Sequence, residues 1–188
     1  MESMGAAFDE SFKKRYRRNK EALEWYDALA MAVAVIAIVF TFFVRIVKVD
    51  GHSMDPTLFN GERILINLMK QPDYGDIVVV DGYTSYGKPL VKRVIGKGGD
   101  TIDIDFAAGI VYRNGVALDE PYTAEPTYLY ESVDFPITVP DSCLFVMGDN
   151  RNNSHDSRAE DVNAIPVENV LGKARCRIWP LDRGGSIY

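Results

Sequence analysis

Ser53 is the residue whose setting first suggests chemistry in this sequence. It lies in the segment GHSMDPTL (residues 51–58), a turn-rich stretch that closely follows a long apolar run. A serine hydroxyl is a poor nucleophile until a neighbouring base removes its proton, and a histidine or a lysine can be that base. The question is therefore which basic side chain the fold brings to Ser53.

The sequence contains two histidines, and the spacing singles out neither of them. His52 is adjacent to Ser53, so in an extended segment the two side chains point to opposite faces. His155 lies in a polar stretch that could approach the serine. A Ser-His-Asp triad therefore stays open but gains little support from the sequence.

Lys92 is the better candidate for the base. In LVKRVI (residues 90–95), strand alternation places Leu90, Lys92 and Val94 on one face, which can remove the lysine from water. Full burial lowers a lysine pKa by ~3–5 units, enough to leave a free amine near neutral pH. A positioned base is worth roughly 10²–10⁴ in rate. The alternative is an ordinary solvated lysine on a strand.

A third segment, GDNRNNSHDSR (residues 148–158), is almost entirely polar and follows an apolar run. It can be interpreted as a solvated loop stabilised by Asn, Asp and Ser turns. It can equally be interpreted as a support that orients the lysine through a serine hydroxyl and is fixed by an Asp–Arg pair. The residues alone leave both interpretations open.

Residues 28–44 contain no charged side chain, and Thr41 is their one polar residue. As a helix they span ~25 Å, which suits a short bilayer crossing. Trp25 and Tyr26 suit a membrane interface, and the basic run at 13–20 places the N-terminus in the cytoplasm. We therefore expect a cytoplasmic segment (1–27), one transmembrane signal anchor (28–44) and an extracytoplasmic catalytic domain (45–188).

Two other interpretations of the apolar run are weaker. A buried core helix seldom has so long an uncharged stretch. A cleaved signal peptide needs a small-x-small cleavage site, and residues 44–49 contain none.

Residues 45–188 consist of short runs of β-branched and apolar residues between Gly- and Pro-containing turns. This pattern predicts a mainly β domain, an antiparallel sheet or barrel, with a hairpin turn at Asn114 and Gly115. Residues 119–138 look irregular. The expected strand regions are 46–49, 63–67, 76–80, 89–95, 110–118, 143–147 and 170–179.

Composition limits the classes of partner. The net charge of the 188-residue chain is −6, and residues 45–188 carry this acidic excess. Nucleic acids bind basic surfaces, so a nucleic-acid partner is not expected. Cys143 and Cys176 are too few for a metal cluster or a disulfide framework and are interpreted as two buried thiols, with a disulfide as the alternative.

Three segments together resemble the pattern of type I signal peptidases, membrane-bound enzymes that cleave signal peptides from exported preproteins. They are residues 51–58, VKRVIG (91–96) and residues 148–158, and GER (61–63) with DIV (76–78) resembles the family's intervening segment. The resemblance implies a mainly β catalytic domain that contains a small β insertion, here at about residues 103–142.

The resemblance also implies a Ser-Lys dyad, with Ser53 as the nucleophile and Lys92 as the general base. Ser154 would hydrogen-bond and orient Lys92. The other implied residues support the site or the structure around it: Asp156, Arg158, Asp149 and Arg93.

One position departs from some members of the family. They carry a serine two positions before the nucleophile, whose hydroxyl helps to bind the oxyanion, whereas this sequence has Gly51. The oxyanion would then bind the Ser53 backbone N–H and a second backbone donor, at Gly51 or His52. Loss of one donor costs ~2.7–4 kcal/mol, so we expect a replacement.

The implied function is a serine endopeptidase of the bacterial cell membrane that cleaves preproteins with small residues at P1 and P3, the first and third positions before the cleaved bond. No metal or cofactor is expected, because the lysine is the base. The lipid bilayer is a further partner, and a secretion translocon stays open as another. Candidate pocket walls, for which core packing is an equally good account, are Val47, Val49, Met54, Leu58, Leu90 and Val91.

Three rival interpretations stay open. A LexA-like self-cleaving regulator also uses a Ser-Lys pair on a β fold, but the apolar run argues against it. A relative specialised in pilin or pilus-subunit processing would share every motif. A catalytically inactive membrane scaffold would keep the fold, although the presence of both Ser53 and Lys92 counts against it.

Overall fold

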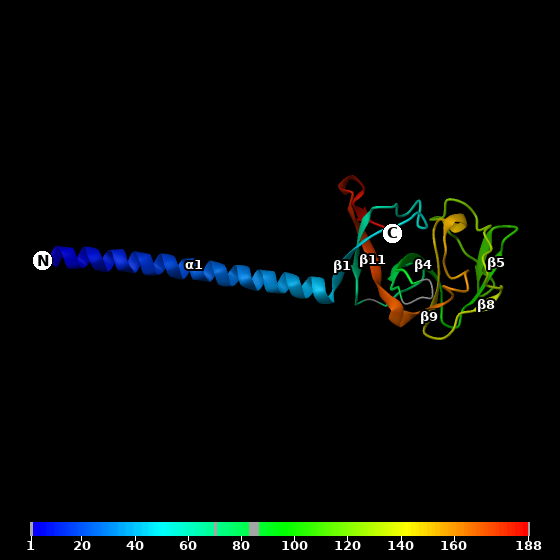
Figure 1. Cartoon of the computed structure of the whole chain (residues 1–188), viewed down its shortest axis with the longest axis horizontal. Coiled ribbons are helices and arrows are strands. Elements are labelled where there is room, and N and C mark those ends of the chain that lie inside the picture. The colour runs from blue at the N-terminus through cyan, green and yellow to red at the C-terminus, as the bar shows by residue number, and fades with distance from the viewer. Residues whose placement is uncertain (1, 70, 83–86, 188) are drawn as a thin grey trace. The chain divides into compact units, whose positions relative to one another are not determined.

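The computed structural model of the chain describes residues 2–69, 71–82 and 87–187, with side chains described from residue 19 onwards. The chain forms two units, an N-terminal helix and a β domain that begins at Val44. Both are labelled in Figure 1.

The N-terminal unit is a single helix, α1 (Glu2–Phe42). It is longer than the apolar run because the preceding residues are rich in Ala, Glu, Lys and Arg, which favour helices. Its stretch Asn19–Phe42 is long and apolar enough to cross a membrane. The expected span reached Val44, but the helix ends two residues earlier because Val44 opens the first strand.

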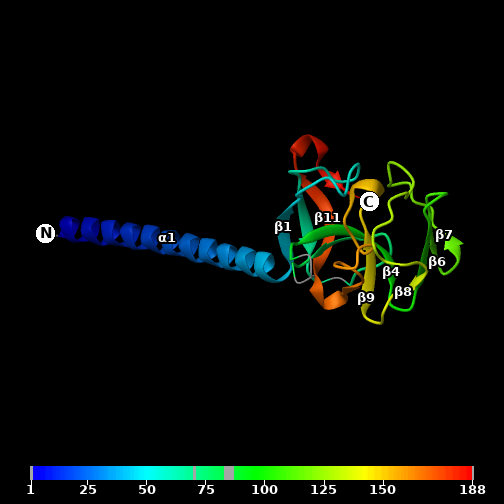
Figure 2. The ribbon, with the colours of Figure 1, turned by 45° about the vertical axis from the view of Figure 1, so that its right-hand side comes forward.

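The β domain is built on an eight-stranded antiparallel sheet in which seven strands follow the order β1-β2-β11-β3-β4-β9-β10 and β12 pairs with β11. β4 therefore lies between β3 and β9. Figure 2 labels β4 and β9. The strands are β1 (Val44–Lys48), β2 (Arg63–Asn67), β3 (Ile77–Val80), β4 (Leu90–Lys97), β9 (Cys143–Met147), β10 (Ile165–Pro166), β11 (Val170–Trp179) and β12 (Gly185–Ser186). Short 3₁₀ turns are η1 (Arg151–Asn153), η2 (Val167–Asn169) and η3 (Leu181–Arg183).

A second, four-stranded sheet has the order β7-β6-β5-β8 and lies between β4 and β9 in the sequence. It spans residues 101–138, close to the expected insertion. Asn114 and Gly115 form its hairpin turn with positive φ angles of 54° and 78°, as an Asn-Gly turn requires. Its strands are β5 (Thr101–Asp105), β6 (Ile110–Arg113), β7 (Val116–Ala117) and β8 (Ile137–Thr138). The mainly β prediction is confirmed.

The two sheets share a hydrophobic core. Phe145 and Met147 of β9 belong to the same buried cluster as Ile102 and Ile104 of β5. Phe145 also packs edge-on against Phe135, with ring centroids 6.0 Å apart. The insertion is therefore packed onto the main sheet by apolar contacts and is part of the same folding unit.

We expect Phe145→Ala to lower the free energy of unfolding by about 3–5 kcal/mol, because the truncation leaves a cavity between the sheets. Denaturant unfolding of the full chain in detergent measures this change. Val116→Ala, at an exposed position of the insertion, is the control and should change it by less than about 0.5 kcal/mol. A loss below about 1 kcal/mol for Phe145→Ala would show that the sheets do not share a core.

Candidate active site

Lys92 occupies the middle of the main sheet. It pairs with Val78 of β3, so its side chain lies on the same face as Val78 and its strand neighbours Leu90 and Val94. All three of these residues belong to one buried apolar cluster. The Lys92 side chain is accordingly buried, with 2% of its residue surface exposed.

Ser53 lies in the loop between β1 and β2, and two buried side chains hold this loop in place. Met54 and Leu58 are both buried in the main-sheet core, and the Leu58 N–H donates to the Met54 carbonyl at 2.9 Å. The turn leaves Ser53 half-buried, with its Oγ 2.6 Å from Lys92 Nζ. Residues 39 positions apart thus form a direct hydrogen bond.

The environment of Lys92 favours its neutral amine. Burial lowers its pKa from 10.5 to about 8; the Asp156 carboxylate acts in the opposite direction, and the Arg158 guanidinium lowers it further. A neutral amine can accept the proton of the Ser53 hydroxyl, whereas an ammonium can only donate to it. The pair is therefore equipped for proton transfer from serine to lysine.

Asp156 is the centre of the polar loop (residues 148–158). Its Oδ2 accepts hydrogen bonds from the Gly148 N–H (2.9 Å) and the Ser154 hydroxyl (2.7 Å). Arg158 donates to both carboxylate oxygens, at 2.8 and 2.9 Å. Burial raises the pKa of Asp156, but the charge and hydrogen bonds of Arg158 outweigh it and hold that pKa below the ordinary value. The loop therefore contains a charged carboxylate close to Lys92.

Ser154 has a different described partner from the expected one. The sequence resemblance implied a hydrogen bond from Ser154 to Lys92, but the Ser154 hydroxyl donates to Asp156 and the described bond of the Lys92 amine is to Ser53. Ser154 is nevertheless adjacent to the serine loop, because a Cβ on Gly148 would collide with both Ser154 Oγ and the Ser53 carbonyl oxygen. The lack of a side chain at Gly148 lets these groups meet.

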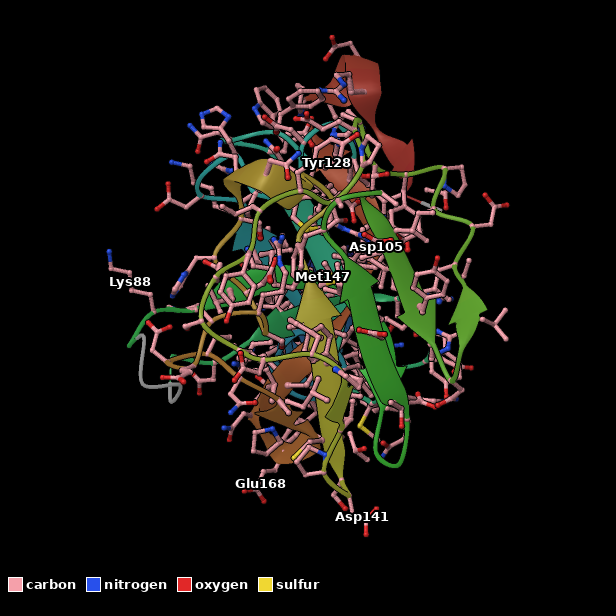
Figure 3. The ribbon with its side chains drawn as sticks, turned by 90° about the vertical axis from the view of Figure 1, so that its right-hand side faces the viewer. Lys88, Asp105, Tyr128, Asp141, Met147 and Glu168 are labelled. Atoms are coloured by element: carbon pink, nitrogen blue, oxygen red, sulfur yellow. The ribbon has the colours of Figure 1, made fainter. Side chains whose placement is uncertain are left out.

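Asn150 is a site residue that the sequence analysis did not single out. Its backbone N–H donates to the Ser53 carbonyl at 3.0 Å, and its side-chain amide donates to the His52 carbonyl at 3.0 Å. Asn150 therefore ties the polar loop to the carbonyl groups of the two peptide bonds that flank Ser53. The polar loop begins directly after Met147, which Figure 3 shows in the middle of the domain.

Arg93 and Asp149, expected to be structural, form a buried ion pair. Arg93 Nε and Nη2 donate to the two Asp149 oxygens at 2.8 and 2.6 Å, and its Nη1 donates to the Gly75 carbonyl at 2.6 Å. The pair connects β4 to the start of the polar loop, next to Gly148. It thereby fixes the position of the polar loop relative to β4, the strand that carries Lys92.

Both histidines have carboxylate partners in the described structure. His52 Nδ1 lies 3.1 Å from Asp55 Oδ2. The two ring nitrogens of His155 each lie 2.9 Å from a carboxylate, of Glu131 and of Asp161. Burial lowers the pKa of His155, but these two hydrogen bonds outweigh it and raise that pKa above its ordinary value. Neither histidine has a described hydrogen bond to Ser53, so the geometry favours the lysine.

Near the serine, the Ser53 and His52 N–H groups have no hydrogen-bond partner among the described residues. The Gly51 N–H, one of the expected oxyanion donors, already donates to Asn60 Oδ1 at 3.1 Å. Among the described residues, the Ser53 N–H has no hydrogen-bond partner. The Ser53 N–H is therefore available to a developing oxyanion, whereas Gly51 would first have to release Asn60.

The six expected pocket residues fall into two groups. Four are core residues: Val49, Met54 and Leu58 are buried in the cluster beneath the serine loop, and Leu90 belongs to the cluster around Lys92. Val47 and Val91 pack against the first of these clusters but are only partly buried. Of the six, these two valines have surface that a substrate side chain can contact.

Neither a metal site nor a disulfide is found in the described part of the chain. No group of three His, Cys, Asp or Glu side chains there could hold a metal ion. Cys143 and Cys176 are free thiols.

A family model described as signal peptidase, peptidase S26, matches residues 22–179. The chain belongs to this family. Signal peptidase I S of Bacillus subtilis strain 168 is 40% identical over 177 residues, which cover 88% of this chain and 93% of the relative. Probable signal peptidase I-1 of Synechocystis sp. is 37% identical, over 85% of this chain and 84% of its own. A solved signal peptidase I of Enterococcus faecalis V583 aligns with 55% of this chain and 97% of its own, at 30% identity and a TM-score of 0.46.

The chain is therefore a signal peptidase, a membrane-bound serine endopeptidase that removes signal peptides from preproteins. The apolar helix α1 fits the membrane anchor of such an enzyme. Membership of this family argues against a LexA-like regulator.

We expect Lys92→Met to stabilise the fold at neutral pH, because it removes a buried amine that folding makes harder to protonate. The lowered pKa corresponds to roughly 3 kcal/mol below pH 8. Between about pH 8 and 10.5 the unfolded chain binds more protons than the folded one, so wild-type stability rises with pH and the advantage of Met fades. Thermal unfolding across this pH range measures the effect.

Lys48→Met, at an exposed position of β1, is the matched control and should change the melting temperature little at any pH. A Lys92→Met protein that is less stable than the wild type at pH 7 would contradict a desolvated amine at this position.

Proposed function

We propose that Ser53 and Lys92 are the nucleophile and the general base of this signal peptidase. The 2.6 Å distance between Ser53 Oγ and a buried Lys92 amine carries the proposal. In the first step Oγ attacks the scissile carbonyl carbon while Nζ accepts the hydroxyl proton. The resulting ammonium then protonates the leaving amine, and the acyl group stays on the serine.

Deacylation uses the same lysine as the base, with water as the nucleophile and Ser53 Oγ as the leaving group. With the leaving peptide gone, the neutral Lys92 amine accepts a proton from a water molecule, and the water oxygen attacks the acyl carbon. The ammonium returns its proton to Ser53 Oγ as the ester bond breaks. The proposed cycle needs no metal or cofactor, because the lysine is the base.

The charges that form during acylation have opposite partners nearby. The Lys92 ammonium forms close to the buried Asp156 carboxylate, which favours the protonated lysine. The oxyanion forms beside the Ser53 N–H, which has no hydrogen-bond partner among the described residues. The His52 N–H is the candidate for the second donor, because Asn60 occupies the Gly51 N–H.

The remaining expected site residues are assigned positioning roles. Ser154 and Arg158 orient Asp156 through hydrogen bonds, and Asp156 in turn fixes the Gly148 N–H. Arg93 and Asp149 hold the start of the polar loop against β4. These contacts support an arrangement in which the polar loop sets both the charge near Lys92 and the position of the serine loop.

The proposed topology places residues 1–27 in the cytoplasm and the catalytic domain, residues 45–188, outside it. The basic run at 13–20 supports this orientation of the span that we expected at 28–44. Small P1 and P3 residues are the proposed substrate preference, with Val47 and Val91 as walls that contact them. A translocon partner belongs to the same proposal, since preproteins reach this enzyme during export.

Ser53→Ala should abolish cleavage of a preprotein that carries an Ala-x-Ala site. Lys92→Ala should lower kcat/KM by about 10²–10⁴, the worth of a positioned base. Both are measured with the full chain in detergent or vesicles, with Lys48→Met as a control of unchanged activity. EDTA should leave the wild-type rate unchanged. A Lys92→Ala enzyme that cleaves at the wild-type rate and loses activity only with His155→Ala would overturn the lysine base.

The pH dependence of kcat/KM should report the Lys92 amine. Since the base must be neutral, kcat/KM should rise about tenfold per pH unit below the pKa of about 8 and level off above it. A pH series of initial cleavage rates at low substrate concentration measures this limb. A rate that is constant between about pH 6 and 9 would contradict the assignment.

A further inference from the structure

A long connection of the insertion runs beside the polar loop. This brace loop (residues 118–136) joins β7 to β8 without regular secondary structure. The Asn152 side chain accepts hydrogen bonds from the N–H groups of Tyr128 and Leu129 and donates to the Pro126 carbonyl. Figure 3 shows Tyr128 in the upper part of the domain and Asp141 at its lower edge.

One ion pair forms the buried centre of this contact. Glu120 of the brace loop accepts two hydrogen bonds of 2.6 Å from the terminal nitrogens of Arg151. Arg151 also donates to the Thr127 hydroxyl at 3.0 Å. The side-chain exposures are 1% for Arg151 and 11% for Glu120, so the ion pair has little contact with water.

Arg151 connects the brace loop to the backbone around the Ser53–Lys92 pair. Its Nε donates to the Gly148 carbonyl at 3.0 Å. Gly148 is the residue whose missing side chain leaves room for Ser154 and the Ser53 carbonyl. Asn150, the neighbour of Arg151 in the chain, donates to the Ser53 carbonyl. The guanidinium of Arg151 therefore fixes the Gly148 carbonyl, two residues before Asn150, which contacts the serine loop.

Tyr122 of the brace loop adds a second contact to the same charges. Its hydroxyl donates to Glu120 Oε1 at 2.8 Å, and its ring lies 4.0 Å from the Arg93 guanidinium. Arg93 is paired with Asp149. The brace loop thus contacts two arginines that bond to the start of the polar loop. Arg151 bonds to Gly148, and Arg93 bonds to Asp149, the next residue.

We propose that Glu120 is a positioning residue for catalysis, which acts through Arg151 and Gly148 on the geometry of Ser53 and Lys92. The inference rests on the dyad proposed above. A buried ion pair adds little to stability compared with well-packed apolar side chains, so its directional hydrogen bonds are its main contribution. Loss of the carboxylate would leave a buried guanidinium whose remaining acceptors include the Gly148 carbonyl.

Glu120→Gln tests the proposal, because it keeps the shape of the side chain and removes its charge and one acceptor. We expect kcat on a preprotein substrate to fall about ten- to hundredfold, as for a small displacement of reacting groups, with KM nearly unchanged. The acidic limb of kcat/KM should move to higher pH, since a displaced Gly148 admits water to Lys92. Glu125→Gln, at an exposed position of the same loop, is the matched control and should behave as wild type.

A double-mutant cycle separates this role from a general loss of stability. Glu120→Gln and Arg151→Lys break the same link, so the double variant should lose no more activity than the more affected single variant. Additive losses, or a Glu120→Gln enzyme with wild-type kcat and pH limb, would overturn the proposal. If Glu120→Gln does not fold, Thr127→Val removes one acceptor of Arg151 and should give the same changes at smaller size.

Ser53→Ala is measured alongside these variants. An active Ser53→Ala enzyme would refute the proposed dyad itself, whereas an inactive Ser53→Ala with a wild-type Glu120→Gln would refute the role of Glu120 alone.

Discussion

The exclusion of water from one amine is the constraint on which the rest of the domain depends. Lys92 can act as a base at moderate pH because apolar neighbours on β3 and β4 surround it, and burial accounts for most of its lowered pKa. The same burial destabilises the folded state whenever the amine takes up a proton. Two features of the fold stabilise it and offset the cost of burying this amine. β4 has a strand on each side, and the main sheet shares a hydrophobic core with the insertion.

Around this amine, buried charges are paired in a way that fixes positions. Three arginines near the dyad each have a carboxylate partner: Arg93 with Asp149, Arg158 with Asp156 and Arg151 with Glu120. Two of these carboxylates lie in the polar loop and one in the brace loop. Because each guanidinium forms several directional bonds, including bonds to backbone carbonyls, the pairs determine where the loop backbone runs rather than how stable the domain is. The loop can then be irregular and yet well defined.

Local sequence patterns predicted the parts of this structure that local physics decides. Alternation along residues 90–95 was enough to place Lys92 with Leu90 and Val94, and the Asn114-Gly115 pair was enough to place a hairpin turn. The family motifs pointed to Ser53 and Lys92, which the fold brings within 2.6 Å of each other. What escaped prediction depends on distant partners: Asn150 meets a loop 98 positions away, and Glu120 meets Arg151 across the insertion. Two further hydrogen bonds could not be predicted from residue spacing, because they depend on where the backbone runs. They are the bond from Ser154 to Asp156 and the bond from the Gly51 N–H to Asn60.

The dyad also has a consequence for inhibition. At a pH near the pKa of Lys92, a substantial fraction of the enzyme carries two nucleophiles, an amine and a hydroxyl, whose reactive atoms are 2.6 Å apart. An ammonium does not attack electrophiles, whereas a free amine forms imines with aldehydes and amides with activated esters. A small electrophile with two reactive centres could therefore bridge the Ser53 oxygen and the Lys92 nitrogen. Such a bridge would occupy both groups at once, and its formation would become slower as the pH falls.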